Sequence, residues 1–361
     1  MKVVAPILPK HYNKAMMKRD DKGYLTYWND EGKIRVFSGI QPTGEIHIGN
    51  YLGAISNWVT FLDDYECFFS IVDHHATTVA YEPGEMPTLI FDAAVANIAA
   101  GLDPAKCTLF VQSEVPEHTE LAWMFGTVTL FGDLGRMTQF KQKARQQEEN
   151  VNAGLFTYPV LQAADILLYK ASLVPVGEDQ VQHIELARKI ARNFNARYSE
   201  VFPECQASVS EAKRILGLDG ENKMSKSLGN SIGVLESPES IWKKLAPAKT
   251  DERRKRKEDP GVPEDCNIYM SYHRHFSPPQ DLEWVSKGCT GARIGCLECK
   301  KRLLENMEKV LGPIRKKAEK LRARPDEVNG VLSRGTERAK KIAAGVMTEA
   351  KAAMGLRRLK G

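Results

Sequence analysis

The sequence contains no run of 18 apolar residues, and its N-terminus lacks the apolar core of a signal peptide. These absences argue against a membrane-spanning helix and a secretion signal, so we expect a soluble, cytoplasmic protein without a membrane partner. Internal repeats and low-complexity segments are also missing, so nothing indicates a repeat architecture.

A strong excess of either charge is missing as well. The sequence has 51 basic and 46 acidic residues, a formal net charge of +5, which permits an anionic partner without requiring one. Hydrophobic residues make up 42% of the chain, which is enough for a core and argues against global disorder. A length of 361 residues predicts two domains.

Cysteines are few and unevenly placed. Cys67 and Cys107 lie beside strand-like apolar runs and are expected to be buried core residues, while Cys205 is isolated. The other four fall within 34 residues: Cys266, Cys289, Cys296 and Cys299. In a cytoplasmic protein such a group is more typical of a metal site than of two disulfides.

Strand and helix patterns alternate from residue 34 onward. Strands are predicted over 34–40, 66–72, 107–112 and 172–176. Helices are predicted over 47–62, 86–101, 118–130, 180–195 and 206–217. This alternation is typical of a parallel, doubly wound sheet, so we predict the α/β class with a Rossmann-type catalytic domain. Ligands of such sheets bind at the carboxyl ends of the strands.

Three segments are predicted along the chain. Residues 1–33 form an N-terminal extension, in which 26–28 would pair with 33–37 in a β-hairpin. Residues 34–235 form the α/β domain. Residues 236–361 form an all-α domain, because strand patterns end and helical spacing follows in 299–323 and 326–354.

The turn after the first predicted strand is one candidate site. Residues 42–50 read Pro-Thr-Gly-Glu-Ile-His-Ile-Gly-Asn. Gly44 permits a tight turn beside a ligand, and a helix beginning near His47 offers N–H groups to phosphate. Thr43 and His47 can donate hydrogen bonds to phosphate oxygens as negative charge builds up. An ordinary strand–turn–helix connection with a capping histidine is the alternative.

The second candidate is the polar loop Lys223-Met224-Ser225-Lys226-Ser227. Two lysines three residues apart can stabilise the β- and γ-phosphates of a nucleotide in a transition state. A solvated basic loop is the alternative. Together with residues 42–50 upstream, the loop indicates a protein that activates a carboxylate with ATP.

These two stretches resemble the HIGH-type and KMSKS signatures of the class I aminoacyl-tRNA synthetases. Residues 37–44, 136–141, 163–167 and 174–180 resemble the tryptophanyl members of that family, and the resemblance extends over residues 36–356. It implies the use of ATP and Mg²⁺ to convert L-tryptophan into tryptophanyl-adenylate, with release of pyrophosphate. It also implies transfer to tRNA(Trp), a helical anticodon-binding domain and a homodimer.

The resemblance implies roles for individual residues. Asp165 would accept a hydrogen bond from the indole N–H, with a helix-capping or ion-paired aspartate as the alternative. The implied catalytic residues are Thr43, His47, Lys143, Lys223 and Lys226. The implied ATP-binding residues are Gln41, Gly44, His47, Gly49, Asn50, Gly177, Asp179, Gln180, Lys223, Met224, Ser225 and Lys226. The implied tryptophan-binding residues are Phe37, Gln41, His75, Tyr158, Gln162, Asp165, Val174, Val176 and Gln180.

Some of these roles have alternatives. Phe37, Tyr158, Val174 and Val176 are equally suited to plain core packing. For Lys143, a surface lysine without a role in catalysis is the alternative. Gln162 stands where many relatives carry methionine, so the resemblance does not determine how this wall of the tryptophan pocket is built. Asp73, His74 and His75 are not interpreted as a metal site, because no third kind of ligand is evident nearby.

The four clustered cysteines are separated by 22, six and two residues, and only Cys296 and Cys299 have the spacing of a zinc knuckle. Four thiolates also suit a cubane iron–sulfur cluster. A subset of tryptophanyl enzymes resembles this pattern and carries a 4Fe–4S cluster in the helical domain. We therefore predict a structural 4Fe–4S cluster, with Zn²⁺ as the alternative.

Basic residues near this group are candidates for contacts with tRNA phosphates. They are the run 253–257, for which a solvated surface is the alternative, and Arg293, Lys300, Lys301 and Arg302. Other functions left open are a tyrosyl enzyme, a regulatory protein without catalysis, and a redox sensor. Intact Thr43, His47, Lys223 and Lys226 argue against lost catalysis. The role of residues 1–33 and the anticodon-reading residues are not indicated by the sequence.

Overall fold

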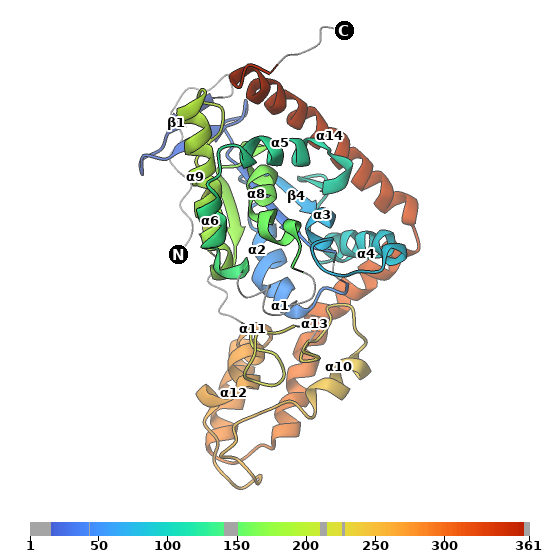
Figure 1. Cartoon of the computed structure of the whole chain (residues 1–361). Helices are drawn as coiled ribbons and strands as arrows, with labels where there is room; N and C mark the ends of the chain where they lie inside the picture. The colour runs from blue at the N-terminus through green and yellow to red at the C-terminus, as the bar shows by residue number, and fades with distance from the viewer. Residues whose placement is uncertain (1–15, 43, 141–150, 210–214, 226–227, 357–361) are drawn as a thin grey trace.

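The computed structural model describes residues 16–42, 44–140, 151–209, 215–225 and 228–356 (Figure 1). The predicted catalytic residues Thr43, Lys143 and Lys226 lie outside this described part of the chain.

Five parallel strands form the central sheet, in the order β5-β4-β3-β6-β7. They are β3 (Arg35–Ile40), β4 (Glu66–Ile71), β5 (Cys107–Val111), β6 (Leu173–Val176) and β7 (Gln206–Val209). The first strand, β3, lies in the middle, and later strands are added on either side of it. This arrangement confirms the predicted doubly wound sheet and four of its strands. It also places the switch point at the carboxyl end of β3.

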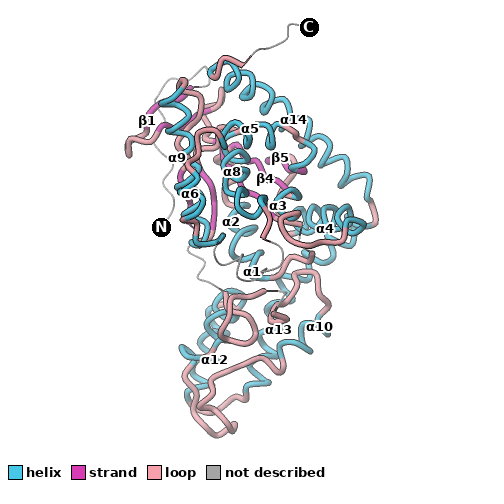
Figure 2. The backbone as a smooth tube through the Cα atoms, in the orientation of Figure 1, coloured by secondary structure: helices cyan, strands magenta, loops and turns pink. Residues whose placement is uncertain are grey.

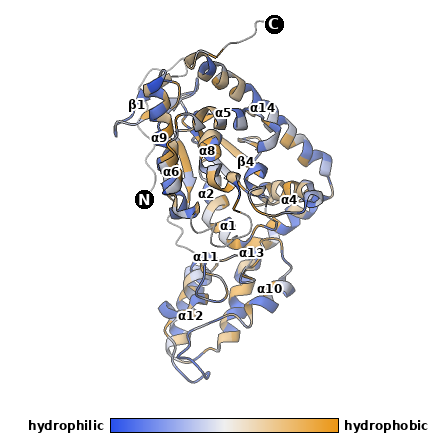
Figure 3. Ribbon diagram, in the orientation of Figure 1, coloured by the Kyte–Doolittle hydropathy of each residue, from blue (hydrophilic) through white to orange (hydrophobic). Residues whose placement is uncertain are grey.

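Helices pack on both faces of this sheet. Figure 3 colours the strands that lie between these helices as mainly hydrophobic. The helices of this part are α1 (Ile48–Asn50), α2 (Ser56–Val59), α3 (Asp73–Ala76), α4 (Met86–Ala99), α5 (Glu117–Gly126), α6 (Phe131–Gly135), α8 (Ala153–Leu167) and α9 (Val181–Arg197). A π-helical turn over Tyr51–Ile55 joins α1 to α2. The predicted helices 47–62, 86–101, 118–130 and 180–195 are therefore confirmed, with ends that differ by a few residues.

The helix predicted over 206–217 is wrong at its start, because Gln206–Val209 forms the edge strand β7, while residues 210–214 lie outside the described part of the chain. Ser208 is buried whereas Val209 is exposed, so the strand has no run of buried apolar residues for the sequence to reveal. Pairing with β6 determines its conformation, as edge strands often depend on their neighbours more than on propensity.

The N-terminal extension does contain a hairpin, but with different partners from those predicted. β1 (Met16–Arg19) pairs with β2 (Leu25–Trp28), and the predicted pairing survives as one bridge between Trp28 and Ile34. The backbone N–H of Tyr27 donates to Ser172 Oγ at 2.9 Å, just before β6 begins. The hairpin therefore lies at the amino ends of the strands, away from the edge where ligands of such sheets bind.

The C-terminal region is helical, as Figure 2 shows. Its helices are α10 (Pro238–Leu245), α11 (Arg274–Phe276), α12 (Pro279–Thr290), α13 (Cys296–Arg322) and α14 (Pro325–Ala353). The Ser237 side chain accepts a hydrogen bond from Ser240 N, which caps α10.

The last helix, α14, does not stay with α10 and α12 but lies beside β5, α4 and α5 (Figure 1). Its Gly335 approaches the backbone of β5 so closely that a Cβ there would lie 1.9 Å from Leu109 O. Ala339 and Ala343 continue this small, fully buried face. Small side chains thus let α14 pack closely on β5 and cover this edge of the sheet.

A buried ion pair joins the first two sheet strands to the N-terminal turn and to α14. Glu66 accepts hydrogen bonds from Arg35 Nε at 2.7 Å, from Asn29 at 2.9 Å and from Arg338 at 3.0 Å. Burial raises the pKa of Glu66, but Arg35 and the other donors outweigh burial and lower it.

Glu66→Gln is expected to destabilise the protein by about 3 kcal/mol, because it leaves the buried Arg35 without its anion. A lowered pKa in the folded state means that this contribution is present above the unfolded pKa, about 4.3, and is lost as the pH falls below it. Urea unfolding between pH 4 and 7 tests this, with the exposed Glu82→Gln as control. Equal midpoints for both variants would contradict it.

Candidate functional site

His47 lies directly after the turn that follows β3 and caps helix α1. Its Nδ1 atom accepts a hydrogen bond from Asn50 N at 3.2 Å, and Asn50 Oδ1 accepts one from His47 N at 3.3 Å. This is a capping box built from histidine and asparagine. Because Nδ1 accepts a hydrogen bond, the neutral ring carries its proton on Nε2. Gly44 has a φ of 97°, which fits the tight turn predicted there.

The two signature stretches lie together in the fold. Ile48 N donates to Ile232 O at 2.9 Å, and Val234 N donates to Ile46 O at 2.8 Å, so residues 46–48 pair with the segment after the lysine loop. A Cβ on Gly49 would lie 3.0 Å from the His47 ring and 3.5 Å from Met224 Cβ. Gly49 therefore makes room for Met224, which is buried.

The lysine loop is braced by the carboxylate of Asp219. Asp219 accepts hydrogen bonds from Glu221 N, Asn222 N and the side chain of Asn230. Asn230 in turn accepts a hydrogen bond from Ser225 N at 2.8 Å. Burial raises the pKa of Asp219, but these donors lower it to about 2, so it stays ionised at neutral pH.

Lys223 connects this loop to the turn after β6. Its Nζ lies 3.8 Å from Asp179 Oδ1, and both side chains are about half exposed. Gln180 also donates to Asp179, and a Cβ on Gly177 would meet the Asp179 carboxylate at 2.7 Å. The predicted ATP-binding residues after β3, after β6 and around 223–225 are thus brought together. Gln41 is exposed at the end of β3.

Asp165 on α8 lies at the centre of a buried hydrogen-bond network and is 1% exposed. Its Oδ1 accepts from Gln112 Nε2 at 2.7 Å and His118 Nδ1 at 2.6 Å, and its Oδ2 accepts from His75 Nε2 at 2.7 Å. Burial raises the pKa of Asp165, but His75 and His118 outweigh burial and hold it below the usual range. The group is an ionised carboxylate inside the protein.

One acceptor position on Asp165 remains. A carboxylate has about four lone-pair sites, and the described residues occupy three of them, two on Oδ1 and one on Oδ2. The remaining acceptor position is on Oδ2, beside the hydrogen bond from His75.

Sequence reasoning missed two members of this network. Gln112 follows β5, and a polar residue directly after a buried strand is the signal that indicates it. His118 lies on α5, where it also contacts the hydroxyl of Tyr169 at 2.8 Å. No local pattern marks His118, because its partners are Asp165 on α8 and Tyr169 just after that helix.

The remaining predicted tryptophan-binding residues differ in their surroundings. Phe37 and Val174 are buried, and Phe37 stacks on Tyr169 with ring centroids 5.7 Å apart. Tyr158 contacts His183 through its hydroxyl and lies edge-on to His75. Val176 and Gln162 are partly buried, and Gln162 lies one turn before Asp165 on α8. Of the four positions with a core alternative, Phe37, Val174 and Tyr158 are buried, and Phe37 and Val174 belong to the hydrophobic core cluster.

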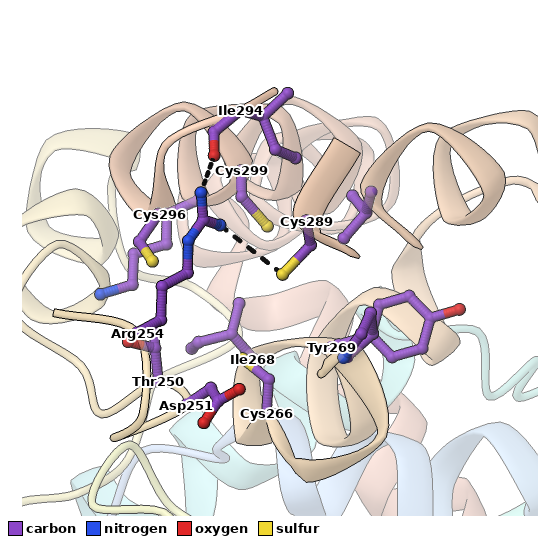
Figure 4. A pocket seen from close by; sticks show the side chains of 13 residues that line it. Thr250, Asp251, Arg254, Cys266, Ile268, Tyr269, Cys289, Ile294, Cys296 and Cys299 are labelled. Atoms are coloured by element: carbon purple, nitrogen blue, oxygen red, sulfur yellow. Dashed lines mark hydrogen bonds between the residues drawn. The ribbon is translucent and has the colours of Figure 1, made fainter. Parts of the chain in front are cut away.

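The four clustered cysteines line one pocket between α12, α13 and the preceding loops (Figure 4). None forms a disulfide. Arg254 Nη1 donates to Cys289 Sγ at 3.6 Å, and Cys299 Sγ lies 3.3 Å from His273 Nε2. Burial raises the pKa of Cys299 to about 12. Among the described residues, no group of three or more His, Cys, Asp or Glu side chains converges as a single metal ion would require.

Two predicted tRNA-contacting cations are not on the surface. Lys300 is 4% exposed, and its Nζ donates to Ala246 O and Ala248 O, both at 2.7 Å. Arg254 is 9% exposed. Helical spacing did not reveal that Lys300 lies on the inner face of α13, where carbonyl oxygens satisfy its charge.

Comparison with known proteins identifies the family. The family described as class I tRNA synthetases (W and Y) matches residues 29–312. The chain belongs to this family. As a synthetase, it is 52% identical over 330 residues to the tryptophan–tRNA ligase of Deinococcus radiodurans, a match covering 90% of this chain and 99% of the relative. It is 43% identical over 328 residues to that of Thermotoga maritima, with the same coverage.

Solved structures show the same fold. A tryptophanyl-tRNA synthetase from Campylobacter jejuni, complexed with ADP and tryptophan, has a TM-score of 0.82 and 34% identity to this synthetase. The match covers 90% of this chain and 100% of that one. A tyrosyl-tRNA synthetase from Archaeoglobus fulgidus has a TM-score of 0.60 at 22% identity, which indicates a shared fold alone. No helix in the described part of the chain is long and apolar enough to cross a membrane.

Proposed function

We propose that the chain is a tryptophan–tRNA ligase, which activates L-tryptophan with ATP and transfers it to tRNA(Trp). The relative at 52% identity carries this name, and the structural neighbour holds tryptophan and ADP. The structural observation that carries the proposal is the buried, ionised Asp165 with one remaining acceptor position. That position suits the indole N–H of tryptophan.

Activation requires no nucleophile from the protein, because the carboxylate of tryptophan attacks the α-phosphorus of ATP and pyrophosphate leaves. The protein contributes positioning and charge stabilisation. His47, with its proton on Nε2 at the start of α1, donates to phosphate oxygens. Lys223 supplies positive charge to the leaving pyrophosphate. Mg²⁺ bound to ATP adds further positive charge at these phosphates.

Selectivity against phenylalanine follows from the same geometry. Phenylalanine has no N–H group, so it would exclude water from Asp165 Oδ2 without replacing the lost hydrogen bond. Tyrosine, the substrate of the alternative function, has a shorter side chain than tryptophan. Its hydroxyl group needs hydrogen-bond partners that differ from those of an indole N–H.

Charging of tRNA(Trp) with labelled tryptophan tests the complete function. We expect aminoacylation of tRNA(Trp) and none of tRNA(Tyr) with tyrosine. The reverse result would establish the tyrosyl alternative. The proposal includes a cytoplasmic location, because ATP and tRNA are found there.

We infer further that the four cysteines hold a 4Fe–4S cluster. They line one pocket without forming disulfides, and the buried Nε of Arg254, which also lines it, has no hydrogen-bond partner among the described residues. The cysteines do not converge on one point, as four ligands of Zn²⁺ would. A cubane cluster presents a separate iron to each thiolate, so it suits this wider arrangement. When bound, it would cross-link α12, α13 and the loop before them.

Metal analysis of the anaerobically purified protein is expected to give about four irons and about four acid-labile sulfides per chain, with little zinc. Cys296→Ser should abolish this content, while the buried Cys107→Ser in β5 should leave it unchanged. One zinc per chain without sulfide would establish the alternative. A metal-free protein with four titratable thiols in this region would contradict both.

We also propose that the protein is a homodimer, formed through an exposed apolar surface on α5 and α6. Trp123, Leu130 and Phe131 are 79%, 62% and 80% exposed, an unusual concentration of large apolar side chains. Phe131 also packs on Phe156, with ring centroids 5.0 Å apart. A second copy of the chain is the occupant that the family resemblance implies.

The double substitution Trp123→Glu and Phe131→Glu is expected to convert the dimer to a monomer, because it places four charges in the shared interface of the two copies. Sedimentation velocity measures the change, with Tyr81→Glu as a control at an exposed tyrosine elsewhere. A wild-type monomer, or a double variant that remains dimeric, would refute this interface.

A further inference from the structure

Arg254 differs from its neighbours in the basic run 253–257. Lys255, Arg256 and Lys257 are exposed, whereas Arg254 is 9% exposed. Its side chain turns inward and lines the cysteine pocket, with its guanidinium beside Cys289 (Figure 4). One residue of a run that suggests a nucleic-acid surface is therefore part of the protein interior.

The guanidinium of Arg254 is held at three points. Nη2 donates to Lys257 O at 2.8 Å and to Ile294 O, and Nη1 donates to Cys289 Sγ at 3.6 Å. The backbone closes around it, since a Cβ on Gly261 would lie 2.5 Å from Cys289 Sγ and 3.3 Å from Arg254 Cδ. The side chain is thus fixed in the pocket.

The described residues leave two features of Arg254 unsatisfied. They offer no hydrogen-bond partner to its buried Nε, and none of their carboxylates forms an ion pair with its guanidinium. Arginine keeps its charge at all physiological pH values, and a buried charge without an anion is costly. An anionic occupant of the pocket with acceptor atoms would supply both missing partners.

We infer that Arg254 is a positioning residue for the cluster, with Nη1 holding the ligand sulfur of Cys289 and Nε donating to an acceptor of the bound cluster. This inference rests on the proposal that the pocket holds an iron–sulfur cluster. Thiolates and sulfides give such a cluster a negative charge, which the guanidinium offsets. Hydrogen bonds to the sulfurs are one of the means by which a protein sets the properties of a cluster.

The same side chain connects the cluster to two surface loops. Through the carbonyl oxygens of Lys257 and Ile294, it holds the loop that carries Lys255 and Arg256 and the loop that carries Arg293. Loss of the cluster would leave the guanidinium charge uncompensated and release both loops. Retention of the cluster and the position of this basic surface are therefore coupled through Arg254.

The test compares full-length wild type with Arg254→Met and Arg254→Lys, purified anaerobically. Iron and sulfide content, the visible absorption, the electron paramagnetic resonance signal of the reduced cluster and the rate of iron loss to a chelator are measured. Arg254→Met is expected to lose iron about tenfold faster, with an altered resonance signal, because a charged hydrogen bond is removed. Arg254→Lys, which keeps the charge but not the fork of donors, should be intermediate.

Lys255→Met is the matched control, since Lys255 lies next to Arg254 in the chain but is exposed and does not line the pocket. It should match wild type. Arg254→Met with the wild-type signal and rate of iron loss would overturn the role of Arg254 while leaving the cluster in place. A wild-type protein without iron and sulfide would overturn the cluster proposal itself, and this inference with it.

Discussion

Asp165→Asn is expected to lower kcat/KM for tryptophan in ATP–pyrophosphate exchange by about two to three orders of magnitude. The substitution removes the buried charge that accepts hydrogen bonds from Gln112, His118 and His75. The NH₂ group of the new amide faces one of these donors and accepts no hydrogen bond from it. Breaking a buried, hydrogen-bonded charge pair costs about 2–5 kcal/mol, which corresponds to this loss.

Most of the Asp165→Asn effect should appear as a higher KM for tryptophan, together with weaker discrimination against phenylalanine. The control is Asp133→Asn, since Asp133 is another buried, ion-paired aspartate but lies on α6. It should retain activity to within about twofold. Thermal unfolding of both variants separates loss of fold from loss of recognition. An Asp165→Asn enzyme with unchanged selectivity would contradict the assignment of Asp165.

Lys223→Ala is expected to lower kcat for exchange by about a hundredfold to a thousandfold, with little change in the KM for tryptophan. A charge that acts on the leaving pyrophosphate stabilises the transition state more than the ground state. The Nζ of Lys223 lies 3.8 Å from Asp179, with both groups about half exposed, so the pair is weak. A weak pair with Asp179 would cost little to break if Lys223 binds the phosphates, as proposed above.

The matched control for Lys223→Ala is Lys249→Ala. Lys249 is a partly exposed lysine that pairs with Glu221 and Glu252 near the same loop, and its loss should change kcat less than about twofold. A Lys223→Ala enzyme with normal kcat but a raised KM for ATP would show that Lys223 binds ATP in the ground state only.

Local sequence patterns predicted the elements of the fold well. Four of the sheet strands are short, mainly apolar stretches, and α13 and α14 have clear helical spacing, so each was visible within its own segment. β7 was missed because only its pairing with β6 makes it a strand. The position of α14 on the sheet depends on Gly335 meeting Leu109, a contact between residues far apart in the chain.

The site shows the same difference between what local sequence reveals and what only contacts between distant residues determine. The resemblance to a known family predicted roles for His47, Lys223 and Asp165, which stay predictions; the structure pairs the segments of His47 and Lys223 and places Asp165 in contact with His75 and Gln112, which follow β4 and β5. It did not identify His118, which matters only through Asp165 and Tyr169. Charge alone suggested a surface role for Arg254 and Lys300, whereas burial gives both an interior one. Side-chain direction, which no local pattern encodes, accounts for these differences.

The central claim is that this chain activates tryptophan, and amino-acid-dependent ATP–pyrophosphate exchange tests it most directly. Exchange is measured with tryptophan, tyrosine and phenylalanine in turn, without tRNA. We predict exchange with tryptophan alone. Exchange with tyrosine would contradict the assignment of Asp165 while keeping the fold and the ATP site. Absence of exchange with all three amino acids would contradict the enzymatic function itself.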